Sequence, residues 1–159
     1  MTELKTEEEQ IEAFKTWWKK SGTSLVLAVS VGVAGYFGIQ AWQQSQANHL
    51  TEASSLFESM SQAATDLTQE KNLKTVSFIA DQLVNEFDDT GYATYAHLFQ
   101  AKVDVIAEDF DAAVDTLNEA KASTDDVTLK AISDLRISKV LIHQGELDKA
   151  LSQLAKISL

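Results

Sequence analysis

A long stretch without charged residues near the N-terminus dominates the hydrophobic pattern of the chain. None of the 31 residues from Ser21 to Thr51 is Asp, Glu, Lys or Arg, and the central 20 residues read TSLVLAVSVGVAGYFGIQAW. A helix of about 20 apolar residues crosses a hydrocarbon core of roughly 30 Å and satisfies its own backbone groups there. Trp17, Trp18 and Trp42, the three tryptophans of the chain, flank the stretch, as indole rings do at the headgroup level. The pattern predicts a transmembrane helix over residues 21–43.

The placement of lysine predicts the orientation of this helix. Lys15, Lys19 and Lys20 precede the span, and no further Lys or Arg occurs before Lys71. Because positively charged flanks stay in the cytoplasm, we expect residues 1–20 to form a cytoplasmic tail and residues 44–159 an exported domain. In a bacterium this describes a single-pass inner-membrane protein with a periplasmic domain.

A cleaved signal peptide is the alternative to a retained anchor. Ser45-Gln46-Ala47 offers small residues at the spacing that a signal peptidase reads. The apolar region is longer than that of a usual signal peptide and the preceding segment is acidic, so retention is favoured. A retained span also carries small side chains at steps of four, four and three residues, namely Ser24, Ala28, Gly32 and Gly35. A partner helix could approach closely along this face, although glycine is also simply frequent in membrane helices.

The rest of the chain carries a repeated helical pattern. Apolar residues at offsets 0, 3, 4, 7 and 10 are typical of one face of an amphipathic helix. Such sets begin 34 and 37 residues apart: Val76, Ile79, Ala80 and Leu83, with Glu86 at the fifth place; Phe110, Ala113, Val114, Leu117 and Ala120; Leu147, Ala150, Leu151, Leu154 and Ile157. An apolar residue also lies twelve residues ahead of each set, at Ala64, Leu98 and Leu135, which indicates another helix before each set. The unit is therefore a helix pair, and three pairs are predicted.

Turn residues separate the predicted helices. Gly91 and Gly145 tolerate the left-handed conformation that ends a helix, and Thr124-Asp125-Asp126 supplies capping oxygens for the next one. We expect helices at about 44–69, 72–87, 91–107, 110–121, 126–143 and 146–157, and no strand. Leu151, Leu154 and Ile157 are expected to pack on the preceding helix, with an exposed binding patch as the alternative.

Composition supports an all-α fold and narrows the function. The chain has no Pro and no Cys, which favours uninterrupted helices and excludes disulfides, cysteine-based metal sites and a thiol nucleophile. Its net charge of −11 without a basic stripe argues against nucleic acid as a partner.

Two resemblances follow from these residues. Gly145-Glu146-Leu147 with Ala150-Leu151 and Leu154 resembles the second helix of a tetratricopeptide repeat, and residues 108–117 match the same places. Leu67 and Ile79 replace small residues in the first pair, and the proline between repeats is absent. The join of Glu12-Ala13-Phe14-Lys15 to Trp17-Trp18 and the charge-free helix, followed by degenerate helix pairs, resembles the YfgM family.

The resemblance implies a function and partners. Members of the YfgM family are ancillary subunits of the SecYEG translocon, so the resemblance implies SecYEG as the membrane partner and PpiD, a membrane-anchored periplasmic chaperone, as a companion. We therefore expect a non-enzymatic subunit that binds exported polypeptides and assists newly translocated proteins. A regulatory adaptor that signals through the cytoplasmic tail is the alternative.

Residues that could carry chemistry do not assemble in the sequence. His49, His97 and His143 are isolated, and the acidic cluster around Asp109 lacks the spacing of a calcium loop, so neither a metal nor a cofactor is expected. No catalytic motif is present, which disfavours an enzyme. Tyr92, Tyr95 and Phe99 share one helical face and could grip an apolar peptide, although such stripes are commonly core.

Overall fold

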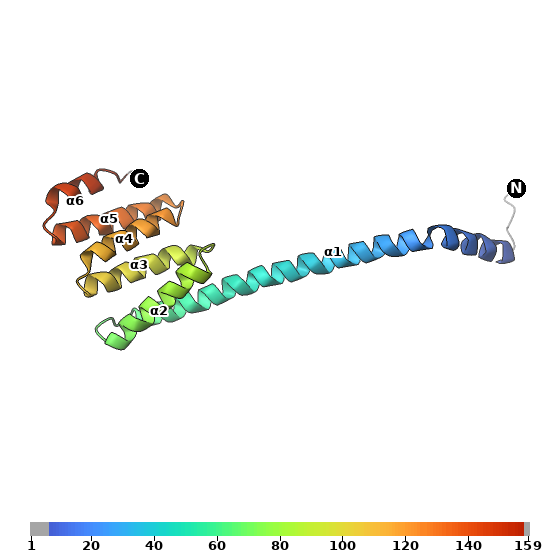
Figure 1. Cartoon of the computed structure of the whole chain (residues 1–159), viewed down its shortest axis with the longest axis horizontal. Helices are drawn as coiled ribbons and strands as arrows, with labels where there is room; N and C mark the ends of the chain where they lie inside the picture. The colour runs from blue at the N-terminus through green and yellow to red at the C-terminus, as the bar shows by residue number, and fades with distance from the viewer. Residues whose placement is uncertain (1–6, 158–159) are drawn as a thin grey trace. The chain divides into compact units, whose positions relative to one another are not determined.

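A computed structural model describes residues 7–157, which form six helices and no strand (Figure 1). The helices are α1 (Glu7–Ala63), α2 (Glu70–Glu86), α3 (Gly91–Ile106), α4 (Phe110–Ala122), α5 (Val127–His143) and α6 (Leu147–Leu154). The all-α fold class is confirmed. The chain divides into two compact units, Met1–Ala47 and Asn48–Leu159, so that α1 contributes to both.

The first unit consists of the described part of α1 up to Ala47. The charge-free segment is helical throughout, and by length and composition it is suited to crossing a membrane. Its large apolar side chains are exposed, an arrangement that an apolar solvent stabilises. Before it, the rings of Phe14, Trp17 and Trp18 lie 6.1–6.5 Å apart. Gly22 has no side chain to clash with the Trp18 ring, since a Cβ there would lie 3.0 Å from it.

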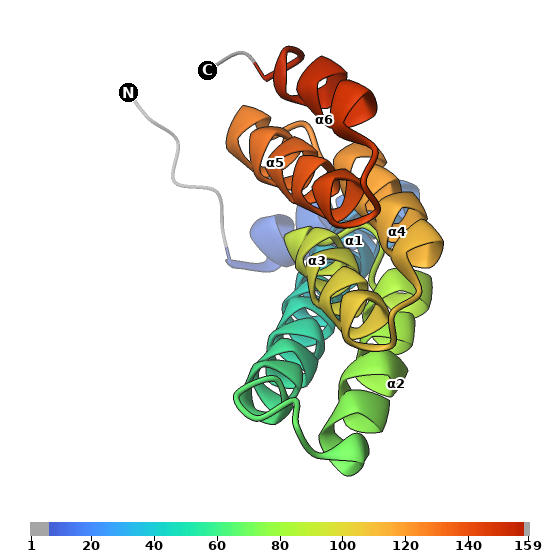
Figure 2. The same ribbon diagram turned by 90° about the vertical axis from the view of Figure 1, so that its left-hand side faces the viewer.

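The second unit is a stack of helix pairs. The predicted stripe of α2 is buried, with Val76, Ile79, Ala80 and Leu83 packed against Ala53 and Met60 of α1. The α4 stripe likewise buries Ala113, Leu117 and Ala120 against α3 and α5. Burial of one large aliphatic side chain stabilises a fold by about 1.5–3 kcal/mol, so these stripes supply much of the stability. Figure 2 shows α3 and α5 on one side of this unit and α2 and α4 on the other.

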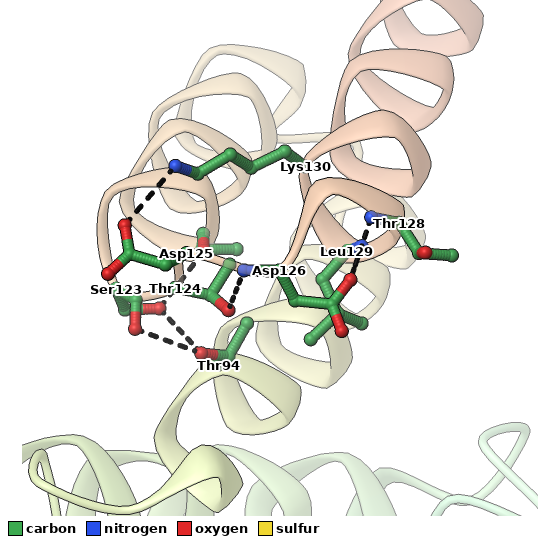
Figure 3. A network of polar contacts seen from close by, with 9 residues as sticks. Thr94, Ser123, Thr124, Asp125, Asp126, Thr128, Leu129 and Lys130 are labelled. Atoms are coloured by element: carbon green, nitrogen blue, oxygen red, sulfur yellow. Dashed lines mark hydrogen bonds and ion pairs between the residues drawn. The ribbon is translucent and has the colours of Figure 1, made fainter. Parts of the chain in front are cut away.

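The turn between α4 and α5 forms as predicted. The Asp126 carboxylate accepts hydrogen bonds from the backbone N–H groups of Thr128 (2.7 Å) and Leu129 (3.1 Å), and it caps α5 (Figure 3). These bonds, the one from Leu129 first, lower the pKa of Asp126. The buried Thr94 hydroxyl lies 2.9 Å from the Ser123 hydroxyl and ties the turn to α3.

The two glycines predicted at turns, Gly91 and Gly145, differ in backbone conformation. Gly145 is left-handed, at φ 81°, as predicted. Gly91 begins α3, where the predicted helix over 91–107 begins, but it is not left-handed as expected. The equivalent of Gly145 in the preceding pair is Glu108, which also has a positive φ, 60°. An L-residue is strained in this region, so the repeat geometry imposes the turn even where glycine is missing.

Two expectations about the ends of the stack were wrong. Helix α1 stops at Ala63, so Ala64 and Leu67 lie in the turn, because the Asp66 carboxylate accepts hydrogen bonds from Thr68 and Gln69 and favours a turn over a helix. At the other end, Leu151 and Leu154 are 65% and 37% exposed and are not buried against α5 as expected, whereas Ile157 is half-buried.

Leu151 and Leu154 are exposed because α6 is rotated so that Ala150 and Gln153 face α5 instead. Leu135 of α5 is also exposed and lies outside the core that its periodicity predicted.

Candidate protein-binding site

The predicted aromatic residues of α3 surround an aromatic residue of α1. The ring of Phe57 lies 5.3 Å from that of Tyr92, 5.6 Å from Tyr95 and 6.1 Å from Phe99. Tyr92 and Phe99 are half-buried against the core, whereas Tyr95 is 41% exposed. The three residues therefore help to join the first two helix pairs, and a role of the Tyr95 edge in binding stays a prediction. Phe57 lies on the helix expected at 44–69 and was missed, because an aromatic stripe on one helix does not reveal the residue that faces it from another helix.

The predicted small-residue face lies open along α1. Ser24, Ala28, Gly32 and Gly35 are exposed, and a Cβ placed on either glycine would meet no atom within 4 Å. The backbone is therefore accessible to a second helix along this line. Its use by a partner stays a prediction.

A groove that the sequence did not predict lies between α3 and α5, with α4 as its floor. Its volume is about 470 Å³. Leu98, Val105, Phe110, Leu117 and Val140 give the groove an apolar lining. Apolar grooves with a few polar groups are where proteins commonly hold ligands.

Basic side chains edge this groove, and no acidic residue lines it. Lys102 comes from α3, and Arg136, Lys139 and His143 come from α5. The Arg136 guanidinium reaches across and donates a hydrogen bond from Nη1 to the backbone oxygen of Leu98 at 3.0 Å. The His143 ring lies 4.7 Å from that of Phe110. The signal in the sequence was the i, i+3, i+7 spacing of Arg136, Lys139 and His143, which places all three on one face of α5.

A second depression, of about 700 Å³, lies between α4, α5 and α6 and mixes charges of both signs. Asp111, Asp115, Glu146 and Asp148 line it together with Lys149 and Lys156. The acidic side chains outnumber the basic ones, and Lys149 is already paired with Glu146, so this surface is neither apolar nor of one charge sign. The groove between α3 and α5 is therefore the better binding candidate.

Asp134 and His97 are two ionisable groups whose surroundings tie them to the fold. The buried Asp134 of α5 accepts hydrogen bonds from Lys121 of α4 and from Gln153 of α6, the latter at 2.6 Å. Burial lowers the pKa of His97, and the Glu119 carboxylate, 3.5 Å from Nδ1, partly opposes this shift. No group of three possible metal ligands occurs within the described part of the chain.

The comparisons with known proteins agree with this architecture. A family model described as a tetratricopeptide repeat-like domain matches residues 15–158. An ancillary SecYEG translocon subunit from Haemophilus influenzae is 34% identical over 151 residues, which cover 95% of this chain and 72% of that protein. Proteins of the same name from Aggregatibacter actinomycetemcomitans and Escherichia coli are 30% and 26% identical over 95% of this chain, and over 72% and 70% of their own lengths. No solved structure matches the chain.

The similarity extends over both units, since the matched residues include the apolar helix as well as the helix pairs. The resemblance predicted from the N-terminal join and the degenerate repeats is confirmed. The chain belongs to the YfgM family of ancillary SecYEG translocon subunits, which carry a tetratricopeptide repeat-like domain.

Proposed function

We propose that this chain is a non-enzymatic, single-pass subunit of a bacterial inner membrane that accompanies the SecYEG translocon. Residues 1–20 lie in the cytoplasm and the helix pairs in the periplasm. The observation that carries the proposal is the 34% identity to a named translocon subunit over 95% of the chain. Similarity to an unrelated helical-repeat adaptor would cover the repeats alone.

The anchor has two tasks in this proposal. Lys15, Lys19 and Lys20 hold the N-terminal side of the span in the cytoplasm. The face of Ser24, Ala28, Gly32 and Gly35 packs against a helix of the translocon, where small side chains permit close van der Waals contact. Anchoring also raises the local concentration of the repeats at the exit of the channel, so that weak contacts with clients suffice.

The helix pairs bind exported polypeptides and a membrane-anchored chaperone of the PpiD type. The exposed Tyr95 of α3 and the apolar groove between α3 and α5 support a role in protein binding. Stacked helix pairs offer such extended surfaces to a peptide or helix laid along them.

Photocrosslinking in cells tests both parts of the proposal. A photoreactive amino acid at Gly35 is expected to capture channel subunits, and one at Tyr95 to capture exported chains or a chaperone. Phe37, on the opposite face of the span, and the exposed Phe78 of α2 are the matched control positions. Equal capture from Gly35 and Phe37, or no translocon component from either, contradicts the proposed docking in the membrane.

The orientation has its own test, because the chain contains no cysteine. A single cysteine in place of Gln144 is expected to react in intact cells with a maleimide that reaches only the periplasm. A cysteine in place of Glu8 is expected to react only after the inner membrane is opened. The reverse pattern rejects the proposed orientation, and a mature chain that begins near Asn48 rejects the anchor.

A further inference from the structure

The groove between α3 and α5 gathers basic side chains in a strongly acidic unit. Residues 48–159 contain 19 acidic and 9 basic residues. Three of the nine, Lys102, Arg136 and Lys139, line this groove. Within the described structure none of these three forms an ion pair, whereas four other lysines do: Lys74, Lys121, Lys130 and Lys149.

The helices that carry these charges provide no neutralising partner. The positions three and four residues before and after Lys102 are all apolar: Leu98, Phe99, Val105 and Ile106. Around Arg136 and Lys139 the corresponding positions on α5 are likewise free of acidic residues. Asp104 of α3 is held instead by Gln100 (2.7 Å) and Thr116 (2.9 Å). The positive charges at the groove therefore repel one another, and an anionic ligand relieves that repulsion.

The apolar surface of the groove continues beyond its basic edge. Tyr95, Phe99, Lys102 and Ile106 follow one another on α3 at the spacing of a single helical face. Tyr95 is 41% and Ile106 43% exposed, and on α5 Leu135 (43%) and Ile142 (51%) are exposed beside Lys139. Apolar positions thus extend to both sides of the charges, so the surface suits an elongated ligand that alternates apolar and anionic groups.

We infer that this groove binds an extended polypeptide segment in which carboxylate side chains flank an apolar residue. The apolar side chain enters between Val105, Phe110 and Val140, and the carboxylates pair with Lys102 and Lys139. Arg136 keeps its hydrogen bond to Leu98 and adds positive charge at the centre. The inference rests on the proposed function, in which the repeats bind exported polypeptides, and it names the class of segment and the site.

Titration of a fluorescent peptide tests this inference on the full chain in lipid nanodiscs. The probe is a short synthetic peptide that alternates Glu with Leu or Phe, and its counterpart carries Gln for every Glu. We expect the Glu peptide to bind and its affinity to fall with added salt, because solvated charges are screened. The double variant Lys102→Gln with Lys139→Gln is expected to bind about tenfold more weakly, the effect of two solvated ion pairs of ordinary strength.

The matched control changes the same amount of charge elsewhere. Lys71→Gln with Lys74→Gln on α2 is expected to leave the affinity within about twofold, because those lysines lie outside the groove. Equal binding of the Gln peptide, or equal loss in the two double variants, overturns the inference. Displacement of the peptide by glycerophosphoglycerol, the soluble headgroup of phosphatidylglycerol, assigns the groove to a lipid headgroup and also overturns the inference.

A crosslinking readout separates failure of this inference from failure of the proposed function. The photoreactive residue at Gly35 reports on the membrane contact with the translocon and does not involve the groove. Capture of channel subunits from Gly35 without Glu-peptide binding rejects the groove as the site and leaves the translocon role standing. Peptide binding without capture from Gly35 supports the groove and counts against the translocon role.

Discussion

Asp134 joins the last three helices of the stack, and its replacement by alanine gives the sharpest test of the fold. Its side chain is 9% exposed and accepts hydrogen bonds from Lys121 of α4 and Gln153 of α6. Removing one member of a buried ion pair costs about 3–5 kcal/mol, because the other charge stays behind without compensation. Since the Lys121 side chain is 27% exposed and can turn toward water, we expect the lower end of this range, about 3 kcal/mol.

Thermal unfolding of the full chain in a mild detergent measures this loss. The tryptophans all lie in or before the span, so far-UV circular dichroism rather than their fluorescence reports on the repeats. For a domain of this size about 3 kcal/mol corresponds to a decrease in Tm of roughly 12 °C. Hydrogen exchange in α6 is expected to accelerate, because that helix loses its polar contact through Gln153.

Two further variants decide whether the buried charge is the cause. Asp125→Ala removes a carboxylate that is fully exposed and 3.6 Å from Lys130, and we expect no measurable change in Tm. Lys121→Met combined with Asp134→Leu and Gln153→Leu replaces both charges and the buried amide that Asp134 accepts from with apolar groups, and it is expected to recover most of the stability. If Asp134→Ala is as harmless as Asp125→Ala, the reasoning about this network is refuted.

Two other predictions concern the turn geometry and the dependence on pH. Glu108→Gly is expected to raise the free energy of unfolding by about 0.5–1 kcal/mol and Gly145→Ala to lower it by about 1–2 kcal/mol, both measured in urea, since each position has a positive φ; a destabilised Glu108→Gly chain contradicts this. The lowered pKa of His97, due to burial and partly opposed by Glu119, means that the unfolded chain takes up the proton more readily. The stability that neutral His97 provides is complete above about pH 6.5 and declines as the pH falls toward the folded pKa. The variant His97→Gln is expected to make Tm less dependent on pH in this window. An unchanged slope of Tm against pH rejects His97 as the cause of this dependence.

The helix pairs were predictable because their signal is local. A stripe such as Val76, Ile79, Ala80 and Leu83 determines both that α2 is a helix and which face is buried. The cap at Asp126 was equally local, because a carboxylate two and three residues before free N–H groups can reach them within one turn. The same reasoning failed for Leu151 and Leu154, since periodicity identifies an apolar face but not the neighbour that covers it.

The end of α1 was predicted wrongly because hydrophobic periodicity takes no account of a side chain that favours a turn over a helix. Apolar residues continue past Ala63, and Leu67 is buried, so the pattern extends the helix. The Asp66 carboxylate instead takes up hydrogen bonds from Thr68 and Gln69, which lower its pKa and favour a turn. A polar side chain within a stripe therefore deserves the same weight as the apolar ones around it.

The groove between α3 and α5 was not predicted because it contains neither converging reactive groups nor an aromatic stripe, the two patterns that indicate a site in a sequence. A net charge of −11 draws attention away from basic residues, yet the local arrangement decides what a surface attracts within a Debye length of about 10 Å. On α5 the acidic Asp134 turns inward to Lys121, which leaves Arg136 and Lys139 as the charges on the exposed face. The buried ion pair and the basic groove are thus linked, since the same rotation of α5 that satisfies Asp134 presents its unpaired basic residues outward. An acidic chain can therefore present a basic binding surface, because its acidic and basic side chains lie on different faces of the same helix.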